Sequence, residues 1–159
     1  MIGLTFLCAG RVKEKHFADA TAEYIKRLGA YCDVSFAEVR EERTSENPSD
    51  AEISAALRRE GAEILAKIPK GAFTIALCVE GKPLSTEEFA ETLRTITLDH
   101  SKLCVVIGSS NGLSGDVKRA AQLRLSMSKM TLPHALARVM AAEQLYRAFN
   151  LLNGGKYHK

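Results

Sequence analysis

The chain ends on Tyr157, His158 and Lys159, three side chains that could do chemistry together. An imidazole can transfer a proton, a phenol can stack on a nucleobase or hydrogen-bond to it, and an ammonium group can contact phosphate. We therefore interpret His158 and Tyr157 as candidate catalytic residues and Lys159 as a candidate RNA contact. The alternative is a disordered polar tail, because chain ends commonly fray.

A second candidate is the loop Gly108 to Gly112, which reads G-S-S-N-G after an apolar run. Its G-x-S-x-G spacing matches the nucleophile elbow of hydrolases, with Ser110 as nucleophile and His134 or His158 as base. An elbow passes directly into a helix, whereas "GLSGD" continues the loop. The same loop could instead be a cradle, because its first glycine lets backbone amides approach an adenosine or a phosphate. A small-residue turn without a ligand is the third possibility.

Basic residues are concentrated near the end of the chain. Residues 118–159 carry eight basic residues against Glu143 alone, a net charge of +7, whereas residues 1–117 carry a net charge of −4. A local basic segment favours a polyanionic partner, because attraction to phosphates depends on local charge. A non-catalytic basic module that binds RNA or the ribosome is therefore an alternative to an enzyme.

Strand-like and helix-like segments alternate along the sequence. Apolar runs predict strands at residues 2–10, 33–39, 72–81, 101–108 and 123–129. Helical spacing predicts helices at residues 12–29, 49–67, 85–99, 116–123 and 133–152. The runs "FTIALCV" and "KLCVVI" are apolar at consecutive positions, which is typical of strands covered on both faces. We predict one α/β domain over residues 1–159, with a mostly parallel sheet and helices on both faces.

Two Ser-x-x-Glu motifs mark predicted helix starts. Ser49 with Glu52, and Ser85 with Glu88, have the spacing of a capping box, in which each side chain binds the other residue's backbone N–H. The predicted inner face of the helix that begins after Ser49 consists of Ile53, Leu57, Ile64 and Leu65.

The cysteines and the N-terminus exclude several classes of protein. Cys8, Cys32, Cys78 and Cys104 lack the spacing of zinc or redox sites, so we interpret them as buried, reduced thiols of a cytoplasmic protein. The apolar run at the N-terminus is too short for a membrane span, and no basic residue precedes it. We expect no signal peptide, no membrane segment and no metal.

The last predicted helix is apolar on two sides. One side holds Val139, Ala142, Leu145, Tyr146, Phe149 and Leu152, and the other holds Leu136, Met140 and Leu151. A helix of this kind needs two partners, of which one can be its own sheet and the other a second subunit. Arg138 falls within the first side, so we expect it to have a carboxylate, phosphate or carbonyl partner. His134 is expected to cap the helix rather than to act in catalysis.

Three stretches resemble a known family: "AEYIKRLGAY", "VVIGSSNGLS" and the closing "LSMSKMTLPHALARVMAAEQLYRAFNLLNGGKYHK". They are similar over the whole chain to the bacterial ribosomal RNA large subunit methyltransferase H family of the SPOUT superfamily. The resemblance implies a SPOUT-like α/β domain with a C-terminal trefoil knot, and a homodimer. It also implies methylation of N3 of a pseudouridine in 23S rRNA, at the subunit interface of the ribosome, with S-adenosylmethionine as methyl donor.

The resemblance also implies which residues act. The expected cofactor contacts are Leu77, Gly108, Met127, Ser128, Lys129, Met130, Thr131 and Leu132. Two positions depart from the family pattern: Ser109 stands where many relatives have glycine, and Cys78 where relatives often have an acidic or polar residue. For this reaction, His158 would take the N3 proton or orient the base, with Tyr157 beside it. Arg138 and Lys159 would hold phosphate, and the tail could act across the dimer.

Overall fold

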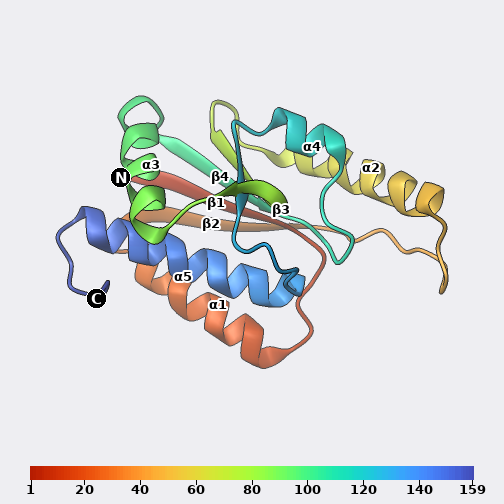
Figure 1. The fold of residues 1–159 in the computed structure, drawn as a ribbon, viewed down its shortest axis with the longest axis horizontal. Helices are drawn as coiled ribbons and strands as arrows, with labels where there is room; N and C mark the ends of the chain where they lie inside the picture. Colours follow the sequence, from red (N-terminus) through yellow and green to blue (C-terminus); the bar gives the residue numbers. More distant parts are fainter.

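The computed structural model describes residues 1–159 and consists of alternating strands and helices (Figure 1). In chain order the elements are β1 (Ile2–Ala9), α1 (Lys15–Leu28), β2 (Cys32–Val39), α2 (Asp50–Lys67), β3 (Phe73–Pro83), α3 (Thr86–Asp99), β4 (Lys102–Ile107), α4 (Gly115–Ala120), β5 (Leu123–Ser126) and α5 (His134–Leu152). The strands pair in parallel, in the order β2-β1-β4-β3-β5. The predicted α/β fold with a parallel sheet is confirmed.

Helices cover both faces of this sheet. On one face α5 packs against α1 and α3, over a core of 19 buried residues, and on the other α2 packs against α4, over a core of 10. Five of the six residues of β4 are buried, because this strand lies between the two cores. The carboxyl ends of the parallel strands therefore meet at one edge, which is where sheets of this type bind ligands.

The two predicted capping boxes have different outcomes. Ser85 and Glu88 form one: the Glu88 N–H donates to Ser85 Oγ (3.1 Å) and the Ser85 N–H donates to Glu88 Oε2 (2.7 Å). Ser49 accepts from the Glu52 N–H (3.2 Å), but the Glu52 carboxylate accepts from the N–H and Oγ of Ser45 instead of the Ser49 backbone. The predicted capping box of Ser49 and Glu52 is therefore wrong, because the loop before α2 folds back onto the Glu52 carboxylate.

The buried face of α2 also differs from the prediction. Its buried residues are Ala56, Glu60, Gly61 and Ile64. Leu65 is exposed, and small residues form the inner face because α2 packs closely on the start of α4. A Cβ on Gly61 would lie 2.3 Å from Ser114 Oγ, so only glycine permits this approach. As a consequence the side chain of Glu60 enters the interior.

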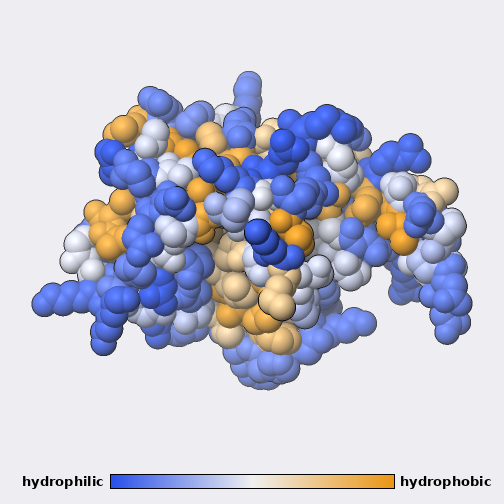
Figure 2. Space-filling model, in the orientation of Figure 1, coloured by the Kyte–Doolittle hydropathy of each residue, from blue (hydrophilic) through white to orange (hydrophobic).

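Helix α5 has no fully exposed residue, as its two apolar sides predicted. The predicted membership of the two apolar sides is partly wrong. Leu151 packs against the main core, whereas Val139 is half-exposed and belongs to neither core cluster. Val139 lies one helical turn from Leu136 and beside Met140, which are also half-exposed and outside both cores. Figure 2 shows apolar surface gathered over the region where Figure 1 places α5 and α1.

The C-terminal tail folds back on α5 instead of extending into solvent. Gly154 has φ of 71°, which turns the chain, and the N–H of Tyr157 donates to Asn150 Oδ1 (3.1 Å). The ring of Tyr157 packs edge-on against Tyr146, with 4.8 Å between centroids. The tail is therefore ordered, contrary to the alternative of a disordered end.

The cysteines are all free thiols, and three of them are buried. Burial raises the pKa of Cys8, Cys32 and Cys104 to about 12, so these thiols stay protonated and act as core side chains. Cys78 is half-buried, which the sequence-based interpretation of four buried thiols did not foresee. None of the five helices has the length and the apolar character that crossing a membrane requires.

Candidate active site

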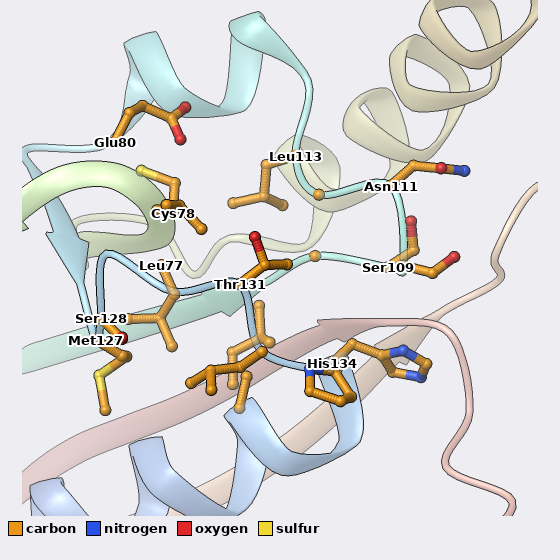
Figure 3. A pocket seen from close by; sticks show the side chains of 18 of the residues that line it. Leu77, Cys78, Glu80, Ser109, Asn111, Leu113, Met127, Ser128, Thr131 and His134 are labelled. Carbon is orange, nitrogen blue, oxygen red and sulfur yellow. The ribbon is translucent and has the colours of Figure 1, made fainter.

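A cavity of about 650 Å³ lies at the carboxyl ends of β4 and β5. Its volume is in the range of small-molecule sites. Side chains from β3, from the loop after β4 and from the loop after β5 face this common space (Figure 3). The start of α5 closes it. The ends of β4 and β5 and the middle of β3 therefore build the cavity, at the edge where a parallel sheet is expected to bind ligands.

Most of the residues predicted to contact a cofactor line this cavity. They are Leu77, Gly108, Met127, Ser128, Met130, Thr131 and Leu132. Lys129, the eighth residue predicted, is exposed and does not line the cavity. The lining also includes Ile107, Leu113 and Ala137, so the walls are mainly apolar with backbone groups at the loops.

Strand β3 supplies one wall through a bulge. Leu77 lies inside β3 and not after it, and both Leu77 and Lys82 pair with Leu125 of β5. The residues between them leave the ladder, and a Cβ on Gly81 would lie 2.7 Å from the backbone of Leu125. The bulge re-aims Cys78, Val79 and Glu80 toward the cavity.

A charged pair stands at this rim. The carboxylate of Glu80 pairs with the ammonium group of Lys118, which belongs to α4. The hydrogen bond from Lys118 holds the pKa of Glu80 below its usual range.

The loop after β4 is a closed turn that only glycine permits at its first position. The N–H of Gly112 donates to the Ser109 carbonyl (2.9 Å), and Gly112 has φ of 86°. A Cβ on Gly108 would lie 2.3 Å from the Gly112 carbonyl oxygen. At Gly108 the loop therefore presents backbone, and no side chain, to the cavity.

Two carboxylates from other parts of the chain hold this loop. The Ser109 hydroxyl donates to Glu60 Oε1 (2.8 Å), and the Ser110 hydroxyl donates to Glu41 Oε1 (2.9 Å). Ser110 therefore has a carboxylate as its partner, whereas a nucleophilic serine needs an imidazole. A nucleophile elbow also passes directly from its serine into a helix, whereas helix α4 begins only at Gly115. The hydrolase interpretation of Ser110 is wrong on both grounds.

The loop after β5 is held by its own side chains. Ser126 Oγ donates to the Ser128 carbonyl (3.0 Å), and the N–H of Met130 donates to Ser128 Oγ (2.9 Å). Held by these hydrogen bonds, the loop runs along the cavity as far as Pro133, which precedes α5. His134 lines the cavity and makes no capping hydrogen bond, so its predicted role as a helix cap is wrong.

Arg138 is buried, with only 1% of its surface exposed. Its Nη2 donates to the carbonyls of Ala9 (3.0 Å) and Gly10 (2.6 Å), and its guanidinium lies 5.9 Å from the ring centroid of Phe36. A carbonyl partner was among those expected, but the predicted contact with RNA phosphate is wrong because this side chain does not reach the surface. Arg138 ties α5 to the carboxyl end of β1.

The candidate catalytic tail lies at the other end of α5. The Tyr157 hydroxyl donates to Glu143 Oε1 (3.1 Å), and His158 Nε2 lies 2.8 Å from Glu87 Oε1. Hydrogen bonding with Tyr24, burial and the carboxylate of Glu143 raise the pKa of Tyr157. The tail reaches back as far as Glu143, the tenth of the 19 residues of α5, and none of its residues lines the cavity of its own chain (Figure 1).

Comparison with known proteins decides the family. A family model described as "Predicted SPOUT methyltransferase" matches residues 2–158. Ribosomal RNA large subunit methyltransferase H proteins from two strains of Listeria monocytogenes are each 45% identical over 159 residues, covering 99% of this chain and 100% of the relative. This chain belongs to the ribosomal RNA large subunit methyltransferase H family. Membership in this family favours a methyltransferase over a hydrolase or a non-catalytic RNA-binding module.

Solved structures share the fold of this family member. A probable methylase family protein from Haemophilus influenzae superposes with a TM-score of 0.57 at 14% identity, covering 96% of this chain and 67% of that chain. A probable methyltransferase from Bordetella pertussis superposes with a TM-score of 0.54 at 20% identity, covering 93% and 96%. The predicted SPOUT-like fold class is therefore confirmed, while the trefoil knot and the homodimer stay predictions.

Several residues around the cavity had no signal in the sequence. Leu113, Lys118 and Ala137 lie in helical or turn segments where nothing marks them as lining residues. Glu60 sits in the charged run "RREGAE", which is typical of a solvated helix face. The only hint was Gly61 beside it, a glycine in mid-helix, which often marks close packing.

Proposed function

We propose that this protein transfers a methyl group from S-adenosylmethionine to N3 of a pseudouridine in the 23S rRNA of the ribosome. One observation carries the proposal. The cavity at the ends of β4 and β5 is lined by seven of the eight residues that family resemblance assigns to the cofactor. Relatives 45% identical over the full chain are named ribosomal RNA large subunit methyltransferase H.

The residues present fit this cofactor. At Gly108 the closed turn offers backbone groups without an intervening side chain, and the apolar walls at Leu77, Ile107 and Leu132 suit an adenine ring. When bound, S-adenosylmethionine supplies an electrophilic methyl group, so the protein mainly has to align donor and acceptor.

The tail residues would handle the RNA base and its proton. N3 of the base loses a proton as it attacks, and we assign its acceptance, or the orientation of the base, to His158. Tyr157 would stack on the base or hydrogen-bond to it, and Lys159, which is exposed, would contact phosphate.

These assignments require a homodimer. None of the tail residues lines the cavity of its own chain. Leu136, Val139 and Met140 form a half-exposed apolar stripe on α5 that suits a second copy. Two α5 helices packed antiparallel across a two-fold axis would bring each tail to the partner's cavity. The proposed location is the cytoplasm, where ribosomes lie.

The test is methyl transfer to ribosomes from a strain that lacks the modification. We expect S-adenosylmethionine with a labelled methyl group to label 23S rRNA once per ribosome. Mass spectrometry of nuclease fragments should place the label on N3 of a pseudouridine. Label on another nucleotide would contradict the proposed target, and salt-sensitive RNA binding without transfer would favour a non-catalytic module.

A further inference from the structure

Glu60 is the only buried carboxylate in the protein, with 3% of its surface exposed. Each of its oxygens accepts one hydrogen bond. Oε2 accepts from the N–H of Glu42 (2.9 Å) and Oε1 from the hydroxyl of Ser109 (2.8 Å). The first donor belongs to the loop after β2 and the second to the cavity loop after β4. Glu60 therefore joins two loops that are far apart in sequence.

No cation compensates this carboxylate. None of the ion pairs includes Glu60, and Arg59 beside it pairs with Glu42 instead. Burial, together with the nearby acids Glu41 and Glu42, raises the pKa of Glu60. A buried, uncompensated carboxylate is costly to fold, and such groups are concentrated at functional sites.

The bond to Ser109 acts directly on the wall of the cavity. Ser109 follows Gly108, where backbone faces the cavity, and its carbonyl closes the turn with the N–H of Gly112. Ser109 is 5% exposed, whereas the neighbouring pair of Ser110 and Glu41 faces solvent. The buried bond is therefore the side-chain anchor that sets where this backbone lies.

We propose that Glu60 is a positioning residue for the methyl donor, acting through the Ser109 hydroxyl on the backbone of the Gly108 loop. The proposal rests on the proposed function, because it takes the donor to be S-adenosylmethionine in this cavity. Glu60 does not line the cavity and touches no reacting atom. It controls how well the loop is preformed, so it acts on cofactor affinity and not on the transfer step.

The test is calorimetry with S-adenosylmethionine on four proteins: wild type, Ser109→Ala, Glu60→Gln and the double variant. Each single variant should weaken binding by about tenfold, the loss expected for one hydrogen bond to a charged group. The double variant should bind no more weakly than the worse single variant, because Glu60→Gln removes the charged acceptor of the same bond that Ser109→Ala removes. Ser45→Ala is the matched control and should stay within about twofold of wild type, since Ser45 also donates to a carboxylate, Glu52 (2.8 Å), but lies outside the cavity.

Kinetics separate positioning from a structural role. The KM for S-adenosylmethionine should rise by about tenfold in Ser109→Ala, while kcat at saturating cofactor stays near wild type. Ser109→Ala with wild-type affinity, or additive effects in the double variant, would overturn the proposal. If Glu60→Gln does not fold, the comparison of Ser109→Ala with Ser45→Ala still tests the proposal. Wild-type protein that binds no S-adenosylmethionine would instead contradict the proposed function itself.

Discussion

At the residue scale, two neighbours in the cavity loop have opposite requirements. Gly108 must lack a side chain, because a Cβ would lie 2.3 Å from the Gly112 carbonyl oxygen. Ser109 must keep its side chain if the loop is to be held by Glu60 (2.8 Å). Gly108, which the resemblance assigns to the cofactor, lines the cavity. The resemblance did not identify Glu60 as the partner of Ser109, because Glu60 lies 49 positions away in a helix whose charged pattern is typical of a solvated face.

Gly108→Val should weaken binding of S-adenosylmethionine strongly while the protein still folds. The loop must shift to accept the new side chain, and overpacking of this kind costs about 1–3 kcal/mol, or roughly 5- to 150-fold in affinity. Calorimetry measures the affinity, and circular dichroism on heating checks the fold. A Kd within twofold of wild type would show that the loop backbone does not meet the cofactor.

At the element scale, the alternation of strands and helices was predictable because each buried strand carries a consecutive apolar run. What could not be predicted depends on contacts between elements. The bulge between Leu77 and Lys82 exists because both pair with Leu125 of β5, a strand more than forty residues further along the chain. The inner face of α2 follows from its close packing at Gly61 on α4, which no periodicity in α2 records.

Because the tail folds back on α5, a change in the tail should affect methyl transfer and leave cofactor binding intact. His158→Ala should leave the Kd for S-adenosylmethionine unchanged, because His158 does not line the cavity of its own chain. The same change should lower the rate of methyl transfer by about 100-fold or more, the usual contribution of a general base. Single-turnover assays on ribosomes measure the rate. Transfer at the wild-type rate would remove His158 from the mechanism.

At the scale of the whole molecule, the candidate site is divided between the two ends of α5. The cavity lies at the helix start and the tail leaves from its end, and a stripe formed by Leu136, Val139 and Met140 lies beside the cavity. The two apolar sides of α5 were visible in the sequence, and so was the reason to expect a second subunit. The predicted trefoil knot leaves no comparable pattern in the sequence, because the periodicity of a segment does not record how the chain passes through a loop.

The central claim is that one cavity and the tail of a second copy form each site, and mixed dimers test it most directly. Gly108→Val and His158→Ala chains are each expected to be nearly inactive alone, at cofactor concentrations well below the Kd of the cavity variant. Refolded together in equal amounts, half of the dimers would pair one chain of each kind. Each mixed dimer would then contain one site with both parts intact, so about a quarter of wild-type activity should return.

A site built within one chain gives a different result. Every chain in the mixture carries one defect, so no site would be intact and the mixture would remain as inactive as the separate variants. Recovery of about a quarter of wild-type methyl transfer is the result that we predict, and no recovery from dimers shown to have exchanged chains would contradict the account.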